Sequence, residues 1–142
     1  MTQVKVRRLL EGAELPPWVA ALDHATFGEA WNSLAPHEAL WVVPEVAFAL
    51  WSRMPAAGEA ELLRIAVAPE ARGQGLGRRL LSTSQRELAD DGLHQLFLEV
   101  RTSNAAAIRL YEACGWTPCG RRPRYYSDGE DAVLYQRQVR RG

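Results

Sequence analysis

The chain has 142 residues, of which 47% are hydrophobic and 24% charged, and its 17 Lys and Arg residues balance its 17 Asp and Glu residues. This length and composition predict a single globular domain over residues 1–142 that is large enough to bury a core. Because the formal net charge is zero, composition gives no support for binding to nucleic acid or to an anionic membrane surface.

The sequence lacks the patterns that are typical of membrane-spanning and secreted proteins. No apolar run reaches the roughly 18 residues of a membrane span, and the first residues have no apolar signal-peptide core. The two cysteines, Cys114 and Cys119, fit neither a disulfide framework nor a zinc site. We therefore expect a cytoplasmic protein that holds no metal.

The N-terminal half of the chain predicts strands around one clear helix. Alternation over residues 4–10 indicates a first strand, and residues 14–31 indicate a helix whose first turn accommodates Pro16 and Pro17. The pattern over 26–40 is ambiguous, and we interpret it as a short second helix with loops. Three further strands are predicted at residues 41–43, 46–53 and 60–69.

The C-terminal half alternates helices with strands. A helix begins at Leu76 and ends near Gly92, with Leu76, Leu80, Ser84 and Leu88 at four-residue spacing. Residues 94–101 are apolar on both faces, which favours a central strand. A helix over 105–114 is followed by an antiparallel pair of strands at 116–126 and 131–139. This order of elements predicts a mixed α/β sheet with right-handed crossovers.

The stretch RGQGLGRRLL, residues 72–81, places three glycines on alternate positions between a strand and a helix. Bare backbone amides at a helix N-terminus are typical of phosphate binding. Neither a dinucleotide fingerprint nor a P-loop fits, because Arg78 occupies the position at which each requires glycine. The remaining pattern, Arg72-x-x-Gly75-x-Gly77, is by itself also compatible with a plain tight turn.

This pattern resembles the acetyl-CoA diphosphate loop of the GNAT N-acetyltransferases. The segments RIAVAPEARGQGLGRRLL, LFLEVRTSNAAAIRLYEACGW and RRPRYYSDGEDAVL extend the resemblance over residues 59–134, and the last two look like the RimI-type ribosomal-protein-alanine N-acetyltransferases in particular. The resemblance implies the GNAT fold, an α/β (α+β) fold with a mixed, mostly antiparallel central sheet. That sheet would have about six to seven strands and about four flanking helices, and would be splayed at the acetyl-CoA site.

The resemblance also implies acetyl-CoA as cosubstrate. Main-chain amides over 73–78 would hold its diphosphate, with added charge from Arg72 and Arg78. The end of the preceding strand would hold the pantetheine arm through unpaired backbone groups, although apolar side chains there are also typical of core. The implied cofactor-binding residues are Ile65, Ala66, Val67, Arg72, Gly73, Gln74, Gly75, Leu76, Gly77, Arg78 and Asn104. Asn104 is equally well explained as a helix N-cap.

Glu99 is the most informative side chain of the predicted central strand. Alternation places Leu96, Leu98 and Val100 on one face, and Phe97, Glu99 and Arg101 on the other. Because carboxylates are rarely buried without a partner, Glu99 is either half of an ion pair, for instance with Arg101, or a functional group. The resemblance implies a general base for the incoming amine, directly or through water. Such a base suits an α-amine, with a pKa of about 8, better than a lysine, with a pKa of about 10.4.

Tyr111 lies on the apolar face of the helix over 105–114, where spacing alone favours a core position. The resemblance implies instead the acid that protonates the departing thiolate of coenzyme A. Arg64 stands where the RimI type usually has a small or polar residue, so we expect it to lie near the acceptor. The stretch RRPRYY favours a loop that places Tyr125 and Tyr126 around a peptide, rather than a nucleic-acid patch.

These features predict an acetyl-CoA-dependent N-acetyltransferase that modifies the N-terminal α-amine of a protein or peptide. By resemblance, the acceptor is the N-terminal alanine of a small-subunit ribosomal protein, and no metal, nucleic acid or membrane takes part. Two alternatives remain open. One is a GNAT enzyme that acts on a small-molecule amine or a lysine, and the other is a non-catalytic acyl-CoA-binding module that serves a partner protein.

Overall fold

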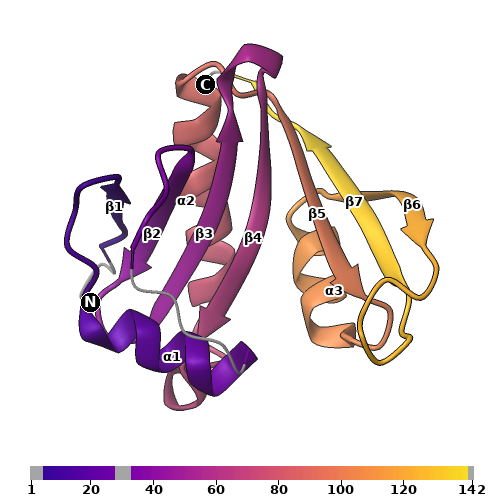
Figure 1. The fold of residues 1–142 in the computed structure, drawn as a ribbon, viewed down its shortest axis with the longest axis horizontal. Coiled ribbons are helices and arrows are strands. Elements are labelled where there is room, and N and C mark those ends of the chain that lie inside the picture. The colour runs from indigo at the N-terminus through magenta and orange to yellow at the C-terminus, as the bar shows by residue number, and fades with distance from the viewer. Residues whose placement is uncertain (1–4, 28–32, 141–142) are drawn as a thin grey trace.

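A computed structural model describes residues 5–27 and 33–140 and contains a mixed seven-stranded sheet of order β1-β2-β3-β4-β5-β7-β6 (Figure 1). The elements are, in chain order, β1 (Arg7–Leu10), α1 (Pro17–Phe27), β2 (Glu38–Val43), β3 (Ala47–Met54), η1 (Pro55–Ala57), β4 (Glu59–Val67), η2 (Pro69–Ala71), α2 (Leu76–Asp90), β5 (Gln95–Arg101), α3 (Ala105–Ala113), β6 (Thr117–Arg122) and β7 (Ala132–Gln138). Only β4 and β5 pair in parallel, so the sheet is mostly antiparallel, as predicted.

Strand alternation divides the core into two layers on opposite faces of the sheet. In β2, Trp41 belongs to the larger core under α2 and α3, whereas Leu40 belongs to the smaller core under α1. The predicted stripe on α2 is buried, and its one polar member, Ser84, donates a hydrogen bond to the Leu80 carbonyl at 2.7 Å. The helices therefore cover both faces of the sheet.

The two central strands separate after a short stretch of pairing. β4 pairs with β5 only from Glu59 to Leu62, opposite Gln95–Leu98. Beyond this point the strands diverge, so that β1–β4 lie on one side of a gap and β5, β7 and β6 on the other (Figure 1). The predicted splay of the sheet is confirmed.

A β-bulge at Leu63 lies where the pairing stops. Arg64 is opposite Leu50 of β3, but Leu62 is opposite Trp51, so Leu63 has no partner in the register. An extra residue bends a strand and reverses the faces of the residues that follow it. As a result, Arg64 points toward α1. Ile65 lies on the opposite face and packs with the core under α2.

Some predicted boundaries were wrong. The described part of the chain has three α-helices rather than about four, because residues 33–37 form no helix. The rest of the ambiguous segment 26–40 overlaps α1, falls on 28–32 outside the described residues, or belongs to β2, which begins at Glu38. The first helix begins at Pro17 rather than at residue 14 and is described as far as Phe27, and residues 28–31 of the prediction lie outside the described residues.

The strand predicted at 116–126 is shorter than expected because it ends at Arg122. Pro123 has no N–H to continue a ladder, and Arg124 has a left-handed φ of 51°. The first strand begins at Arg7 rather than residue 4, which lies outside the described residues.

One ion pair anchors α1 to the sheet. Asp23 of α1 is fully buried, and its two carboxylate oxygens accept hydrogen bonds from Nη1 of Arg64 at 2.7 and 2.8 Å. The Arg64 guanidinium also lies 5.3 Å from the centre of the Phe27 ring. Since Arg64 follows the bulge directly, this pair links the position of α1 to the divergence of β4.

Replacing Asp23 with Ala should lower the free energy of unfolding by about 2–3 kcal/mol, because it removes a fully buried carboxylate together with its two hydrogen bonds to Arg64. Asp91→Ala is the matched control. It removes the exposed ion pair of Arg8 with Asp91 at 2.7 Å and should cost about 1 kcal/mol or less. Urea unfolding measures both values, and equal losses would contradict an anchoring role for Asp23.

Candidate functional site

Two adjoining cavities open into the gap between β4 and β5. The first, of about 570 Å³, is lined by Thr26, Ile65, Ala66, Val67, Ala71, Arg72, Gly73, Gly75, Leu76, Gly77, Arg78, Asn104, Ala106, Ala107 and Leu110. The second, of about 410 Å³, is lined by Phe27, Leu62, Leu63, Arg64, Ile65, Glu99, Val100, Arg101, Asn104, Ala107, Tyr111 and Tyr126. The two cavities adjoin, because they share Ile65, Asn104 and Ala107. Nearly all the predicted cofactor residues line the first cavity, and both predicted catalytic residues line the second.

The three glycines of the loop meet two different requirements. Gly73 and Gly75 have left-handed φ values of 79° and 77°, which residues with a side chain rarely adopt. Gly77 has an ordinary helical backbone, but a Cβ there would lie 3.2 Å from Cδ2 of Leu110 on α3. Two glycines therefore form the turn, and the third allows α2 and α3 to approach closely.

The start of α2 presents main-chain donors to the first cavity. Gly75 is the N-cap residue and offers no side-chain hydrogen bond, and the amide of Arg79 makes the first bond of the helix, to the Gly75 carbonyl at 3.0 Å. The amides over 76–78 precede that bond and have no partner within the helix. Together with the helix dipole, they form a site suited to an anion.

The side chain of Arg72 makes a contact that the sequence did not indicate. Its Nε donates a hydrogen bond to the Val67 carbonyl at 3.1 Å. The side chain thus ties the glycine loop to the end of β4, in addition to bringing positive charge to the cavity.

The end of β4 lines the first cavity with side chains and backbone. Ile65 and Val67 are half-buried, whereas Ala66 is buried and also packs in the core under α1. Beyond Leu62 the strand pairs only with β3. Its other edge therefore carries main-chain groups with no partner strand, and these face the gap.

Glu99 projects from β5 toward the second cavity, and its side chain is only 18% exposed. Its carboxylate pairs with Nε of Arg122 on β6 at 3.0 Å. A hydrogen bond from Tyr125 to the same carboxylate raises the pKa of Tyr125. The suggested ion pair with Arg101 is wrong, and the partner of Glu99 is Arg122.

Arg101 instead belongs to a cluster that holds the loop between β6 and β7. It pairs with Glu130 at 3.0 Å and with Asp128 at 2.8 Å, and its guanidinium lies 4.1 Å from the centre of the Tyr126 ring. Glu130 also accepts a hydrogen bond from the Ser103 amide at 2.8 Å. Hydrogen bonds from Ser103 and Arg101 lower the pKa of Glu130 to about 2. This cluster positions Tyr126 in the second cavity.

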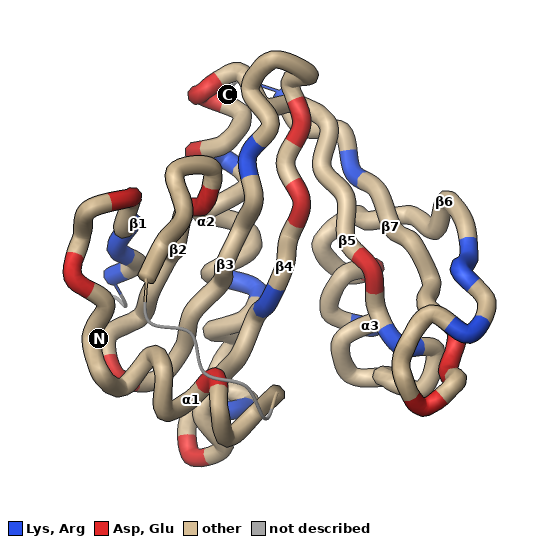
Figure 2. The backbone as a smooth tube through the Cα atoms, viewed as in Figure 1, with Lys and Arg blue, Asp and Glu red and all other residues tan. Residues whose placement is uncertain are grey.

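Sequence reasoning assigned no role to Glu130 or to Glu61. Glu61 of β4 lines a further cavity of about 340 Å³ together with Glu99 and Arg122. Burial, and then the charge of Glu99, raise the pKa of Glu61. Figure 2 shows acidic bands on both β4 and β5, those of β4 toward the end where the two strands pair. Alternation along β4 could have indicated that Glu61 shares a face with a second polar side chain, but not that it lies near Glu99.

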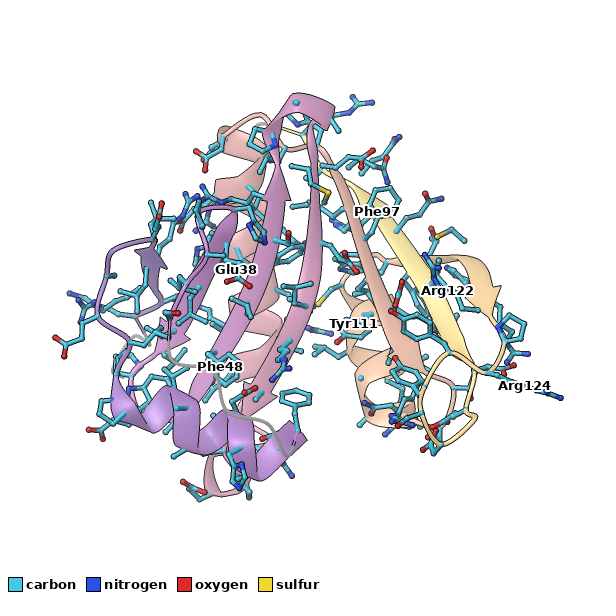
Figure 3. The ribbon with its side chains drawn as sticks, in the orientation of Figure 1. Glu38, Phe48, Phe97, Tyr111, Arg122 and Arg124 are labelled. Carbon is cyan, nitrogen blue, oxygen red and sulfur yellow. The ribbon has the colours of Figure 1, made fainter. Side chains whose placement is uncertain are left out.

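Tyr111 of α3 belongs to the core and also reaches the site (Figure 3). It is 6% exposed, and its ring centre lies 6.2 Å from that of Trp116 and 6.5 Å from that of Tyr135. Burial, with a smaller contribution from Tyr126, raises the pKa of Tyr111 far above its ordinary value. Its hydroxyl therefore remains protonated at neutral pH.

Asn104 caps α3, because its Oδ1 accepts a hydrogen bond from the Ala107 amide at 3.2 Å. It also lines both cavities, so the two interpretations of this residue are compatible. Within residues 5–27 and 33–140, no three His, Cys, Asp or Glu side chains are grouped as a metal site would require. No helix in that part of the chain combines the length and apolarity needed to cross a membrane.

Comparison with known proteins places this geometry in a family. The chain matches the acetyltransferase (GNAT) family over residues 5–116. A ribosomal protein bS18-alanine N-acetyltransferase of Escherichia coli K12 is 51% identical over 79 residues, which are 54% of this chain and 53% of that protein. The match thus spans about half the length of that curated relative.

Solved structures of similar fold are consistent with the family match. The ribosomal-protein-S18-alanine N-acetyltransferase from Escherichia coli has a TM-score of 0.76 at 30% identity, over 97% of this chain and 96% of that one. A putative streptothricin acetyltransferase from Bacillus anthracis, solved in complex with acetyl coenzyme A, shares the fold with a TM-score of 0.66 at 20% identity, over 74% and 64% of the two chains. From the family match, the splayed sheet and the glycine loop, we conclude that the chain belongs to the acetyltransferase (GNAT) family.

Proposed function

We propose that the chain is an acetyl-CoA-dependent N-acetyltransferase that modifies the α-amine of a protein N-terminus. The observation that carries the proposal is that one continuous gap joins an anion-binding helix terminus to a largely buried carboxylate, Glu99. Likeness to the Escherichia coli enzyme favours the N-terminal alanine of a small-subunit ribosomal protein as acceptor.

The first cavity suits coenzyme A along its length. The amides over 76–78 would hold the diphosphate, and the unpaired edge of β4 would pair with the amides of the pantetheine arm in the manner of an added strand. A bound acetyl-CoA would supply the reactive thioester. The β4 edge then offers main-chain N–H groups to the negative charge that develops on the thioester oxygen.

Glu99 is the proposed general base. It would accept the proton that the amine must lose, directly or through a water, while Arg122 and Tyr125 hold its carboxylate in position. The α-amine is the easier group to deprotonate, since its pKa is about 8 and that of a lysine is about 10.4. A carboxylate base without a metal is therefore better matched to an N-terminus than to a lysine side chain.

Tyr111 is proposed to assist the departing sulfur. Because its pKa is raised, it holds its proton firmly and acts first as a hydrogen-bond donor to the charge that grows on sulfur. A thiolate whose pKa is about 8.5 is a weaker base than tyrosinate, so this hydrogen bond, rather than early proton transfer, is the main contribution of Tyr111.

The acceptor class is tested with acetyl-CoA and three substrate sets, with thiol release as the readout. Thiol should be released from acetyl-CoA in the presence of peptides that have a free N-terminal alanine and no lysine. N-terminally blocked lysine peptides and small amines such as spermidine should give no release. Activity confined to the latter two sets would contradict α-amine transfer. Coenzyme binding without release in any set would indicate the non-catalytic module.

Glu99→Gln should lower kcat by about 100-fold or more, because the amide cannot accept a proton at neutral pH, and should leave acetyl-CoA affinity unchanged. Glu61→Gln is the matched comparison, since Glu61 is the neighbouring carboxylate but does not line the second cavity. Its loss of kcat should be much smaller. Steady-state kinetics with the alanine peptide measure kcat for both variants. A larger loss of kcat in Glu61→Gln than in Glu99→Gln would assign the base to Glu61.

Tyr111→Phe should lower kcat about 10-fold or more while it preserves the packing of the ring, the free energy of unfolding and acetyl-CoA affinity. Tyr135→Phe is the control, because that hydroxyl donates to Glu112 at 2.8 Å outside the two cavities. Wild-type turnover in Tyr111→Phe would restrict Tyr111 to a role in the core.

A further inference from the structure

Another cavity adjoins the anion site on the outer side of α2. It encloses about 470 Å³ and is lined by Gly75, Arg78, Arg79, Ser82, Thr83 and Arg86, a group that we term the arginine cavity. It shares Gly75 and Arg78 with the first cavity, so a ligand held at the start of α2 can extend into both.

Helical spacing explains why these side chains meet. Arg78, Ser82 and Arg86 are four residues apart, and Arg79 and Thr83 form the adjacent row. Side chains three and four residues apart are neighbours on a helix surface. The first three turns of α2 therefore present two adjacent rows of guanidinium and hydroxyl donors on one face of the helix.

The charges in this row oppose the helix dipole. Acidic side chains are favourable in the first turn of a helix and cations are unfavourable, yet the first turn of α2 has no acidic residue and contains Arg78 and Arg79. The first acidic side chain of the helix is Glu87, which accepts a hydrogen bond from Trp41. Within the part of the chain that the structure describes, Arg78 and Arg86 form no ion pair with a carboxylate. An anion from outside the protein would balance the charges of Arg78 and Arg86.

We propose that the arginine cavity binds the 3′-phosphate of coenzyme A, an inference that rests on the proposed use of that cosubstrate. The diphosphate is already matched by the amides over 76–78, which leaves the arginine cavity for a second phosphate group. The ribose that carries the 3′-phosphate is bonded directly to the diphosphate. A phosphomonoester carries about −1.5 to −2 charges at pH 7, and guanidinium groups match its oxygens in pairs.

Isothermal titration with coenzyme A and with 3′-dephospho-coenzyme A tests this assignment in the full chain. The wild type should bind coenzyme A about 10-fold or more tightly than the dephospho form, as expected for one or two charge-assisted hydrogen bonds. Arg86→Gln should lose most of that preference, with an unchanged Kd for the dephospho form. Arg86→Lys should retain part of it, because it preserves the charge.

Arg109→Gln is the matched control, since Arg109 is an exposed arginine of α3 that lines neither the first two cavities nor the arginine cavity, and it should keep the wild-type preference. Equal affinity of the wild type for the two coenzymes would overturn the assignment and leave the proposed function standing. Equal weakening of both by Arg86→Gln would also overturn it. Failure of the wild type to bind either coenzyme would refute the proposed function itself.

Discussion

The separation of β4 from β5 after Leu62 leaves main-chain hydrogen-bonding groups unpaired in the middle of a sheet. Such groups are costly when buried, so a sheet opens in this way only where water or a ligand can satisfy them. Here the bulge at Leu63 turns β4 away from its neighbour, and the strand keeps its pairing with β3 up to Val67. The opening is therefore part of the fold, and both cavities depend on it.

The charged groups around the opening are arranged in two sets with different functions. Glu99 and Glu61 lie on the strands that diverge, where burial and mutual repulsion act on Glu61, and Arg122 balances them. Glu130, by contrast, is fully engaged with Arg101 and the start of α3 and fixes the loop that carries Tyr126. Under the proposed function, the first set would provide the general base, and the second would hold the side of the site against which an acceptor would bind.

Local patterns predicted much of this structure. The stripe on α2, the alternation of β5 and the position of the glycine loop depend on residues near one another in sequence, and all three were predicted correctly. The pairing of Glu99 with Arg122 was not predictable, because β7 lies between β5 and β6 in the sheet and no local signal specifies that order. The Glu61–Glu99 proximity depends in the same way on parallel pairing between strands separated by a helix. The structural role of Glu130 arises from contacts more than twenty residues away along the chain.

The close approach of Gly77 to Leu110 has a mechanical consequence. Under the proposed function, the start of α2 would hold the diphosphate and Tyr111 of α3 would lie beside the sulfur. The contact between the two helices would then set the distance between the two ends of the pantetheine arm. A thioester on a shorter or longer arm would bind at one end and be misplaced at the other, so this contact would favour one length of acyl carrier.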